Sequence, residues 1–239
     1  MNKGYLLGLF VVVILVTGFV PGRRDAATMT TIHFKHWVGN KELVLFDETY
    51  TNSFGEPFVV NKFRYYISGL SFTDAQGEHS LPENYYLVDE ADSLSKTIQL
   101  PAAGIQSISF IIGVDSSRST GGVQTGSLDP ANGMFWTWNS GYVFAKLEGQ
   151  SDSSHAPVHS LSWHVGGFRQ QENALRRIKL TVSSQAGAAN NTIIVHANIL
   201  KWFDAVHPLK ISQSPVCHQA GKLAMLLADN YSAMFSVVP

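Results

Sequence analysis

The chain has 239 residues, of which 45% are hydrophobic and 15% charged, a composition that is typical of a packed domain and excludes a solvated, disordered chain. One all-β domain of roughly 200–250 residues would use this whole length. The formal net charge of −1 supplies no basic field to hold a phosphate backbone, so we expect no nucleic-acid partner.

The N-terminus is predicted to be an export segment. Lys3 precedes an uncharged run over residues 5–20, and polar residues resume at Pro21. A short basic start followed by an apolar stretch is the layout of a secretory signal. The run also approaches the ~20 residues of a membrane-spanning helix, so an uncleaved anchor is the alternative. Either way, we expect residues 1–27 to be this signal or anchor and residues 28–239 to be one periplasmic or otherwise extracytoplasmic domain.

The rest of the chain is predicted to be all-β. Short runs with period-two alternation, rich in β-branched and aromatic residues, are separated by turns rich in Gly, Ala and Asn. This pattern favours an antiparallel β-sandwich of about ten strands. The ten predicted strands are residues 30–36, 42–46, 58–68, 85–88, 97–100, 107–114, 142–147, 160–165, 176–182 and 192–200.

Helical periodicity is clear only near the C-terminus. Ala220, Leu223 and Leu227 recur at helical spacing, which predicts a short C-terminal helix over residues 217–231 that caps one end of the sheets. Cys217 is the only cysteine, so an intramolecular disulfide and a cysteine-rich zinc site are both excluded. We expect its side chain to be a plain thiol and not a metal ligand.

Residues 115–139 form a long, weakly patterned stretch rich in Gly, Ser, Thr and Asn, and ordered loops of this length often carry function. Asp115, Asp129 and Asn132 offer the oxygen donors that calcium takes in groups of about 6–8. Their spacing matches no EF-hand, and short Asp and Asn residues are ordinary turn formers, so we favour the turn interpretation over calcium.

The sequence lacks the motifs of common enzyme classes. It contains no Gly-x-Ser-x-Gly elbow, His-Glu-x-x-His pair, phosphate-cradling loop or Rossmann glycine pattern. Glu148 could act as a lone acid, but a solvated strand end is the plainer interpretation. We therefore predict a binding protein and not an enzyme.

Several segments resemble the signature block of the MbnP-like family, namely residues 113–116, 126–142 and 146–149. The likeness covers nearly the whole mature chain and extends to residues 62–68, 86–89, 164–167 and 228–235. MbnP is the periplasmic partner of methanobactin copper-acquisition loci and is similar to the methanotroph copper proteins MopE and CorA. In those relatives imidazoles hold Cu(I) together with kynurenine, which a dihaem peroxidase-like partner makes from a tryptophan. The resemblance implies copper storage, uptake or handover.

Trp136 and Trp138 are the candidates for such an oxidation. They lie two residues apart, so on an extended segment both side chains face the same way. An intact indole N–H has no available lone pair, whereas the opened ring exposes an amine that can donate to a metal. The alternative is that both indoles simply cover the mouth of the sandwich, with their N–H groups bonded to loop carbonyls.

Copper(I) accepts two or three soft or imidazole donors, so a site of this kind requires two histidines that converge on one aromatic position. His36 shares a strand face with Ile32 and Phe34 and should point inward. His164 precedes two glycines that permit a bulge or a close backbone approach. His207 lies in a connection that could fold over the same end. These three are the predicted ligands, and a satisfied structural role is the alternative for each.

The remaining histidines have weaker claims. We expect His196 to be solvated or in a second layer, because it faces away from the apolar side of its strand. His33 cannot chelate with His36 on a regular strand, since the two face opposite sides. The others sit in polar segments and are His79, His155, His159 and His218.

The chain departs from its copper-binding relatives at one position. Those relatives can carry a Trp-x-His arrangement where this chain has Trp136 and Trp138, so one ligand is then missing or supplied from elsewhere. The alternative function is a metal-free sandwich that binds a protein partner, such as the dihaem peroxidase-like protein, through the aromatic edge at residues 134–142. Contact with a membrane is expected only through an uncleaved N-terminal segment.

Overall fold

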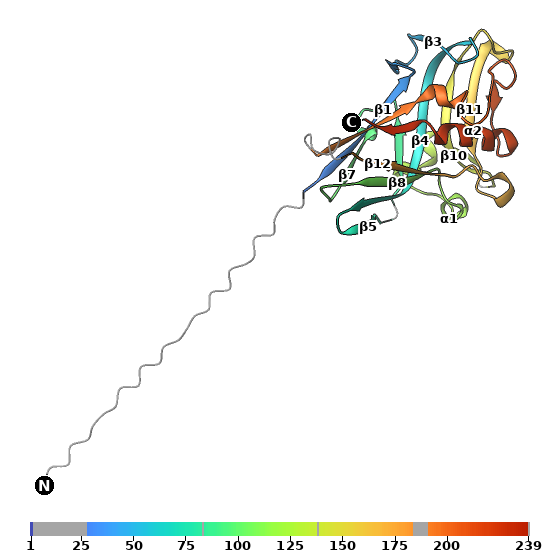
Figure 1. The fold of residues 1–239 in the computed structure, drawn as a ribbon. Coiled ribbons are helices and arrows are strands. Elements are labelled where there is room, and N and C mark those ends of the chain that lie inside the picture. The colour runs from blue at the N-terminus through green and yellow to red at the C-terminus, as the bar shows by residue number, and fades with distance from the viewer. Residues whose placement is uncertain (2–27, 83, 138, 184–190, 239) are drawn as a thin grey trace.

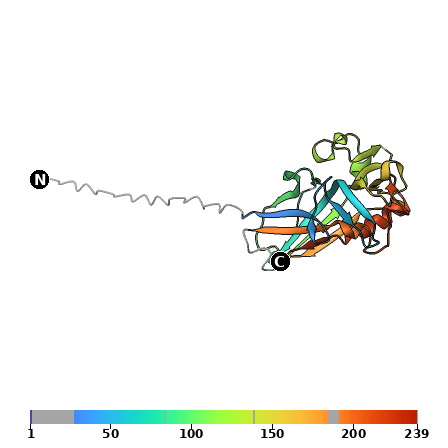
Figure 2. The same ribbon diagram turned by 90° about the horizontal axis from the view of Figure 1, so that it is seen from above.

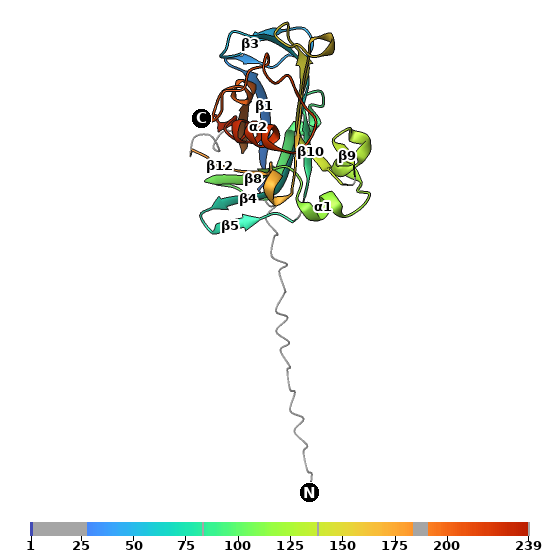
Figure 3. The same cartoon turned by 90° about the vertical axis from the view of Figure 1, so that its right-hand side faces the viewer.

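The protein is a sandwich of two β-sheets. The computed structural model describes residues 1, 28–82, 84–137, 139–183 and 191–238, which form a five-stranded and a ten-stranded sheet. Figure 3 shows β1 (Thr30–Val38) and β10 (Gly141–Gln150) on opposite sides of the interior, with α2 (Lys222–Ser232) between them in this view. The predicted all-β sandwich with a short C-terminal helix is therefore confirmed.

The five-stranded sheet contains strands from both the N-terminal and the C-terminal part of the domain. β1 pairs in parallel with β13 (Thr192–Asn198), and the two strands run side by side in Figure 2. Every second residue of β1 is buried, because one face of the strand packs against the interior. The other strands of this sheet are β2 (Lys41–Glu42), β7 (Thr97–Leu100) and β15 (Phe235–Val237).

The ten-stranded sheet is larger and mostly antiparallel (Figure 1). Only its outermost pair on the main path, β11 and β14, is parallel among the described strands. The main path runs through β12 (Arg176–Thr181), β8 (Ser107–Ile112), β4 (Pro57–Asp74), β10, β11 (Ser160–Gly166) and β14 (Val216–Cys217). Short strands extend the sheet and are β3 (Thr49–Thr51), β5 (Gly77–Ser80), β6 (Tyr86–Asp89) and β9 (Phe135–Thr137).

Helices in the described part of the chain are short. α2 closes one side of the sandwich, where it packs against β11 and β12. Its buried Asn230 donates to the carbonyl oxygens of Trp202 and His207 at 3.0 and 2.7 Å and so fixes the preceding connection. The others are α1 (Ser116–Thr120) and the 3₁₀ helices η1 (Leu94–Lys96), η2 (Gly126–Leu128), η3 (Pro130–Asn132), η4 (Pro157–His159), η5 (Gln170–Glu172) and η6 (Ile199–Trp202).

Aromatic rings fill the space between the sheets. Phe34 of β1 makes edge-to-face contacts with Tyr65, Phe110 and Phe235, at centroid distances of 6.2, 5.9 and 6.5 Å. Burial of one such ring stabilises the fold by about 1.5–3 kcal/mol. This gain is large compared with the small cost of keeping a polar residue on the opposite side of the strand, which faces solvent. The interior therefore fixes which face of each strand points inward.

Several predicted boundaries were wrong, as for β4, which continues to Asp74, and three of them have a local reason. The strand predicted over residues 42–46 is present only as β2 at Lys41–Glu42, and the left-handed φ of 71° at Phe46 excludes an extended strand end there. The helix begins at Lys222 and not at residue 217, since Cys217 joins β14. β13 ends at Asn198, whose side chain accepts a hydrogen bond from the backbone N–H of Leu200 and caps η6.

Residues 115–137 cross the outer face of the ten-stranded sheet. Figure 3 shows α1 and β9 on the side of β10 that is turned away from β1. Two tyrosine hydroxyls on the sheet hold this segment, since Tyr66 donates to the Ser127 carbonyl at 2.9 Å and Tyr142 to the Leu128 carbonyl at 2.6 Å. Most of the predicted export segment, residues 2–27, lies outside the described residues. Among those that are described, no helix is long and apolar enough to cross a bilayer.

Candidate metal centre

The outer face of β10 and β11 carries a row of polar side chains. Lys146 of β10 is the register partner of Arg64 on β4 and of His164 on β11. Leu147 and Trp163, the next residues along these strands, are buried in the interior. Since side chains alternate along a strand, His164 points to the outer face of the sheet.

A carboxylate on the neighbouring strand holds the ring of His164. Its Nε2 lies 2.7 Å from Glu148 Oε1, and Lys62 Nζ lies 3.1 Å from the other carboxylate oxygen. The hydrogen bond from His164 is the largest cause that lowers the pKa of Glu148 to about 2. Glu148 is therefore ionised and accepts the bond, so Nε2 carries the proton and Nδ1 keeps a lone pair. Metal-binding histidines are commonly oriented in this way by a carboxylate.

A second imidazole lies against the first. The ring centroids of His164 and His218 are 4.4 Å apart, and their planes are inclined by 32°. Ser162 Oγ lies 3.3 Å from the Nε2 of His164 and 2.7 Å from the Nε2 of His218. Burial, and then the nearby His164, lowers the pKa of His218, which favours the neutral imidazole that binds metal ions.

The short strand β14 brings His218 to this position. Val216 and Cys217 pair in parallel with Ser162 and Trp163 of β11, so the next residue of the chain lies beside His164. Burial raises the pKa of the Cys217 thiol to about 11. The thiol is therefore protonated at neutral pH, and a protonated thiol is a poor metal ligand.

The indole of Trp136 packs on β11 at Gly166, two residues along the strand from His164. A Cβ placed on Gly166 would lie 2.9 Å from Trp136 Cζ3, so glycine at this position permits the close approach of the ring. Gly166 and His164 share the outer face of β11, two residues or roughly 7 Å apart. The indole Nε1–H is buried and lacks a hydrogen-bond partner among the described residues. The expected bond from this N–H to a loop carbonyl is therefore not found there.

His36 lies in a different environment, inside the sandwich. It is 1% exposed, and its ring nitrogens lie 2.6 Å from Glu90 Oε2 and 3.0 Å from the hydroxyl of Tyr65. The ring of Phe63, on the inner face of β4, packs against it at a centroid distance of 4.8 Å. His36 and His164 are thus separated by the ten-stranded sheet, and the structure does not bring these two predicted ligands together.

The other predicted ligands are also separate from the pair on the outer face. His207 Nε2 lies 2.9 Å from Asp229 Oδ2, and its backbone N–H donates to Asn230 Oδ1 at 2.8 Å. It therefore has a structural role at α2. Trp138 lies outside the described residues. His196 stacks on Trp37 with ring centroids 4.9 Å apart, on the outer face of the other sheet.

The oxygen donors considered for calcium act as turn and cap residues. Asp115 accepts from the backbone N–H of Arg118 at the start of α1. Asp129 accepts from the backbone N–H of Ala131 at 2.8 Å and caps η3. Asn132 donates its side-chain amide to two loop carbonyls, each at 3.0 Å. These contacts are those of the turn interpretation.

Sequence reasoning missed three of the residues around His164, namely Glu148, Ser162 and His218. Glu148 was expected at a solvated strand end, but it lies within β10 and contacts His164 and Lys62. Strand alternation could have placed Glu148 on the outer face with Lys146. No local signal identifies His218, because its position depends on the parallel pairing of β14 with a distant strand.

In the chain segments that the structure describes, no group of three or more His, Cys, Asp and Glu side chains is arranged to hold a metal ion. The cluster on the outer face instead combines two imidazoles with an indole. We name this set, which consists of His164, His218, Trp136, Glu148 and Ser162, the outer-face cluster. A third donor at this position would have to come from a residue of another type, and Trp136 is the neighbouring candidate.

Fold and site together define a two-sheet β-sandwich with a histidine pair on one outer face and a tryptophan packed on the same strand. The family model described as MbnP matches residues 27–219, and the chain therefore belongs to the MbnP family. The solved structure of MbnP from Methylosinus trichosporium has a similar fold, with a TM-score of 0.58 and 16% identity over 76% of this chain and 79% of that one. No curated protein matches the chain.

Proposed function

We propose that this protein is an exported Cu(I)-binding protein that stores or hands over copper through the outer-face cluster. The observation that carries the proposal is the contact between two imidazoles, 4.4 Å apart at their centroids, one of which is held by an ionised carboxylate. Export is supported by the uncharged run at residues 5–20. No catalytic role is proposed, in line with the absence of enzyme motifs in the sequence.

The imidazole pair suits a soft, low-coordinate ion. Cu(I) accepts two or three nitrogen donors, and His164 offers its Nδ1 lone pair because Glu148 holds the proton on Nε2. Either tautomer of His218 is compatible with its surroundings, since the Ser162 hydroxyl can donate a hydrogen bond to its Nε2 or accept one from it. In this arrangement His218 supplies the imidazole that relatives carry two residues after the tryptophan.

Trp136 would become the third donor after oxidation. Cleavage of the indole C2–C3 bond by two equivalents of peroxide adds two oxygen atoms and releases two waters, and hydrolysis of the N-formyl product releases formate. The kynurenine that remains has an aniline amine, whose nitrogen can donate a lone pair. A dihaem peroxidase-like partner is the proposed catalyst of this oxidation. The buried Nε1–H of Trp136 supports this choice, because no hydrogen bond to a described residue gives this polar atom a structural role.

The alternative of a metal-free docking surface at residues 134–142 receives less support. Met134 and Tyr142 are 0% and 1% exposed, so the largest side chains at the two ends of this segment face the protein and not a partner. Among the described residues of this segment no large apolar side chain is fully exposed, and such side chains are the anchors that usually carry binding energy.

The experiment uses the mature domain, produced with and without the peroxidase-like protein. Peptide mapping by mass spectrometry would detect the loss of one carbon and the gain of one oxygen at Trp136. Competition with a chromogenic Cu(I) chelator would then measure affinity in the wild type and in the His164→Ala, His218→Ala and Trp136→Phe variants. We expect each variant to lower the Cu(I) affinity by at least about tenfold.

Trp37→Phe is the matched control. Trp37 also has a buried Nε1–H without a partner among the described residues, and it stacks on the imidazole of His196, but it belongs to the other sheet. We expect it to remain unoxidised and its variant to bind Cu(I) like the wild type. Equal Cu(I) affinity in the wild type and in the His164→Ala and His218→Ala variants would refute the proposal.

A further inference from the structure

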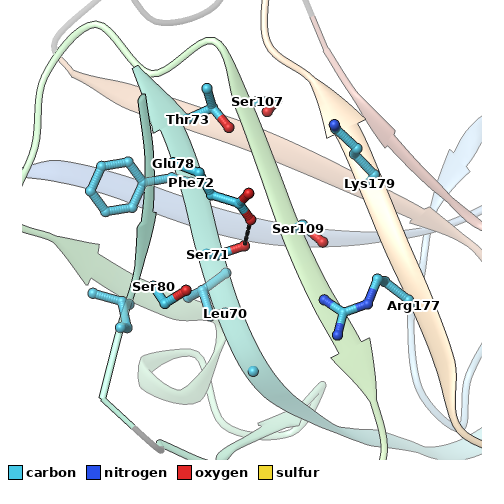
Figure 4. Close-up of a pocket in the computed structure, with 12 residues that line it drawn as sticks. Leu70, Ser71, Phe72, Thr73, Glu78, Ser80, Ser107, Ser109, Arg177 and Lys179 are labelled. Atoms are coloured by element: carbon cyan, nitrogen blue, oxygen red, sulfur yellow. Dashed lines mark hydrogen bonds between the residues drawn. The ribbon is translucent and has the colours of Figure 1, made fainter. Parts of the chain in front are cut away.

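A polar groove lies on the outer face of the ten-stranded sheet, outside the outer-face cluster. It is formed by β5, β4, β8 and β12, and its volume is about 590 Å³. This is within the range of sites that hold small molecules. Figure 4 shows its floor of serine and threonine hydroxyls, with a carboxylate on one side and two cationic side chains on the other.

The register of four strands builds this floor. Ser71 of β4 is paired with Ser80 of β5 and with Ser109 of β8, and Ser109 is paired in turn with Lys179 of β12. In the neighbouring row, Thr73 of β4 is paired with Glu78 of β5 and with Ser107 of β8. Two adjacent rows of hydroxyls thus run across the sheet without an apolar side chain between them.

A β-bulge turns these hydroxyls outward. The pairing of β4 with β8 shifts between Ser68 and Ser71, so one extra residue of β4 is accommodated there. Beyond the bulge Phe72 is buried and Ser71 lies in the groove. Without the extra residue the two side chains would exchange faces, because strand side chains alternate with a period of two.

The two cations of the groove form no ion pair with the described residues. Arg177 and Lys179 are exposed, lie two residues apart on one face of β12, and take part in no side-chain ion pair or hydrogen bond within the described residues. Elsewhere on this face cations are paired, as in Arg64 with Asp89 at 2.8 Å. An unpaired guanidinium beside an ammonium is well suited to carboxylates, since the guanidinium can donate two parallel hydrogen bonds.

The opposite side of the groove accepts hydroxyl groups. Glu78 Oε1 lies 3.4 Å from Ser71 Oγ, so the carboxylate is held over the hydroxyl floor (Figure 4). A ligand that fits must therefore carry negative charge towards β12 and hydroxyl groups towards β4 and β5. Leu70 and Phe72 line the groove but are buried, so among the described residues the floor exposes no aromatic ring for stacking, which argues against an apolar ligand.

We propose that this groove binds a small hydroxylated carboxylate. Its carboxylates contact Arg177 and Lys179, and its hydroxyl bonds to Ser109, Ser71 or Glu78. The site is independent of copper, because its residues belong to other strands or other parts of them than the outer-face cluster.

Citrate is the probe, titrated into the metal-free mature domain and followed by calorimetry and by NMR shifts of the β4, β8 and β12 amides. Tricarballylate has the same three carboxylates but lacks the hydroxyl, and we expect it to bind at least about threefold more weakly because it forms one hydrogen bond fewer. Arg177→Gln and Lys179→Gln should each weaken citrate binding by about tenfold. Increased salt should weaken it further.

Two controls keep the test specific. Lys201→Gln removes an exposed cation on η6, remote from the groove, and His164→Ala removes an imidazole of the outer-face cluster. Both should bind citrate like the wild type. The proposal is overturned if these controls weaken binding as much as Arg177→Gln, if phosphate or sulfate binds as tightly as citrate, or if citrate shifts no amide of the groove strands.

Discussion

Two histidines on opposite sides of the ten-stranded sheet are each bonded to a glutamate. Inside, His36 lies 2.6 Å from Glu90, and outside, His164 lies 2.7 Å from Glu148. The local chemistry is nearly the same, but the surroundings differ. The His36 side chain is 0% exposed and surrounded by aromatic rings, whereas the His164 side chain is 18% exposed and lies against a second imidazole.

Burial decides what each pair can do. Burial is the largest influence on His36 and lowers its pKa, although Glu90 opposes that shift. Both ring nitrogens of His36 are occupied by protein partners, so no lone pair is free for a ligand. His164 has a partner on Nε2 only, and its Nδ1 has none among the described residues. This free lone pair is the reason that the proposed metal site includes His164 and not His36.

The largest expected effect is on stability at the inner pair. His36→Ala would leave the Glu90 carboxylate and the Tyr65 hydroxyl short of a partner, at a cost of about 3 kcal/mol in the free energy of unfolding. His164→Ala on the partly exposed outer face should cost less than about 1 kcal/mol. Urea unfolding of both variants measures the difference, and equal losses would mean that burial does not separate the two pairs.

The second prediction concerns the carboxylates. Glu148→Gln removes the ionised acceptor that orients His164 and should lower the Cu(I) affinity by about 10–100-fold. Glu90→Gln is the matched change at the inner pair and should leave Cu(I) affinity unchanged. Chelator competition at a temperature where both variants are folded provides the measurement. Loss of affinity in both variants would place the ligand site elsewhere.

Gly166→Ala tests the contact between the indole and the outer face. The new Cβ would lie 2.4 Å from the Tyr142 carbonyl oxygen and 2.9 Å from Trp136 Cζ3, so the ring must move. We expect a loss of about 1–3 kcal/mol in stability, together with a change in Trp136 fluorescence. Gly55→Ala, at a position with open space around the added Cβ, should leave Trp136 fluorescence unchanged.

The smallest expected effect is an acid-dependent one. The folded-state pKa of Glu148 is about 2, below its ordinary value of 4.5, so its contribution to stability is complete above about pH 4.5 and is lost as the pH falls towards 2. Partial exposure and salt screening reduce this contribution to about 1 kcal/mol. Urea midpoints at pH 7, 4.5 and 3 should fall less in Glu148→Gln than in the wild type. An identical pH profile for the two proteins would contradict the ionised state of Glu148.

Much of the fold could be predicted because its cause is local. The period-two pattern of β1 follows directly from alternate burial of Ile32, Phe34 and His36, and it predicts both the strand and its inward face. The same rule does not identify the neighbours of His164, because the sequence of a strand does not show which strand lies beside it. The prediction that His36 and His164 converge needed that missing information, because the two residues belong to different sheets and lie on opposite sides of the ten-stranded one.

The sequence by itself determined the all-β architecture, the family and the inward position of His36, because each depends on residues close together in the chain. Tertiary structure alone decided that His218 lies against His164 and that Trp136 rests on Gly166. Those contacts depend on pairing between distant strands, β14 with β11 and β9 with β10, and strand register is set by the packing of the whole interior.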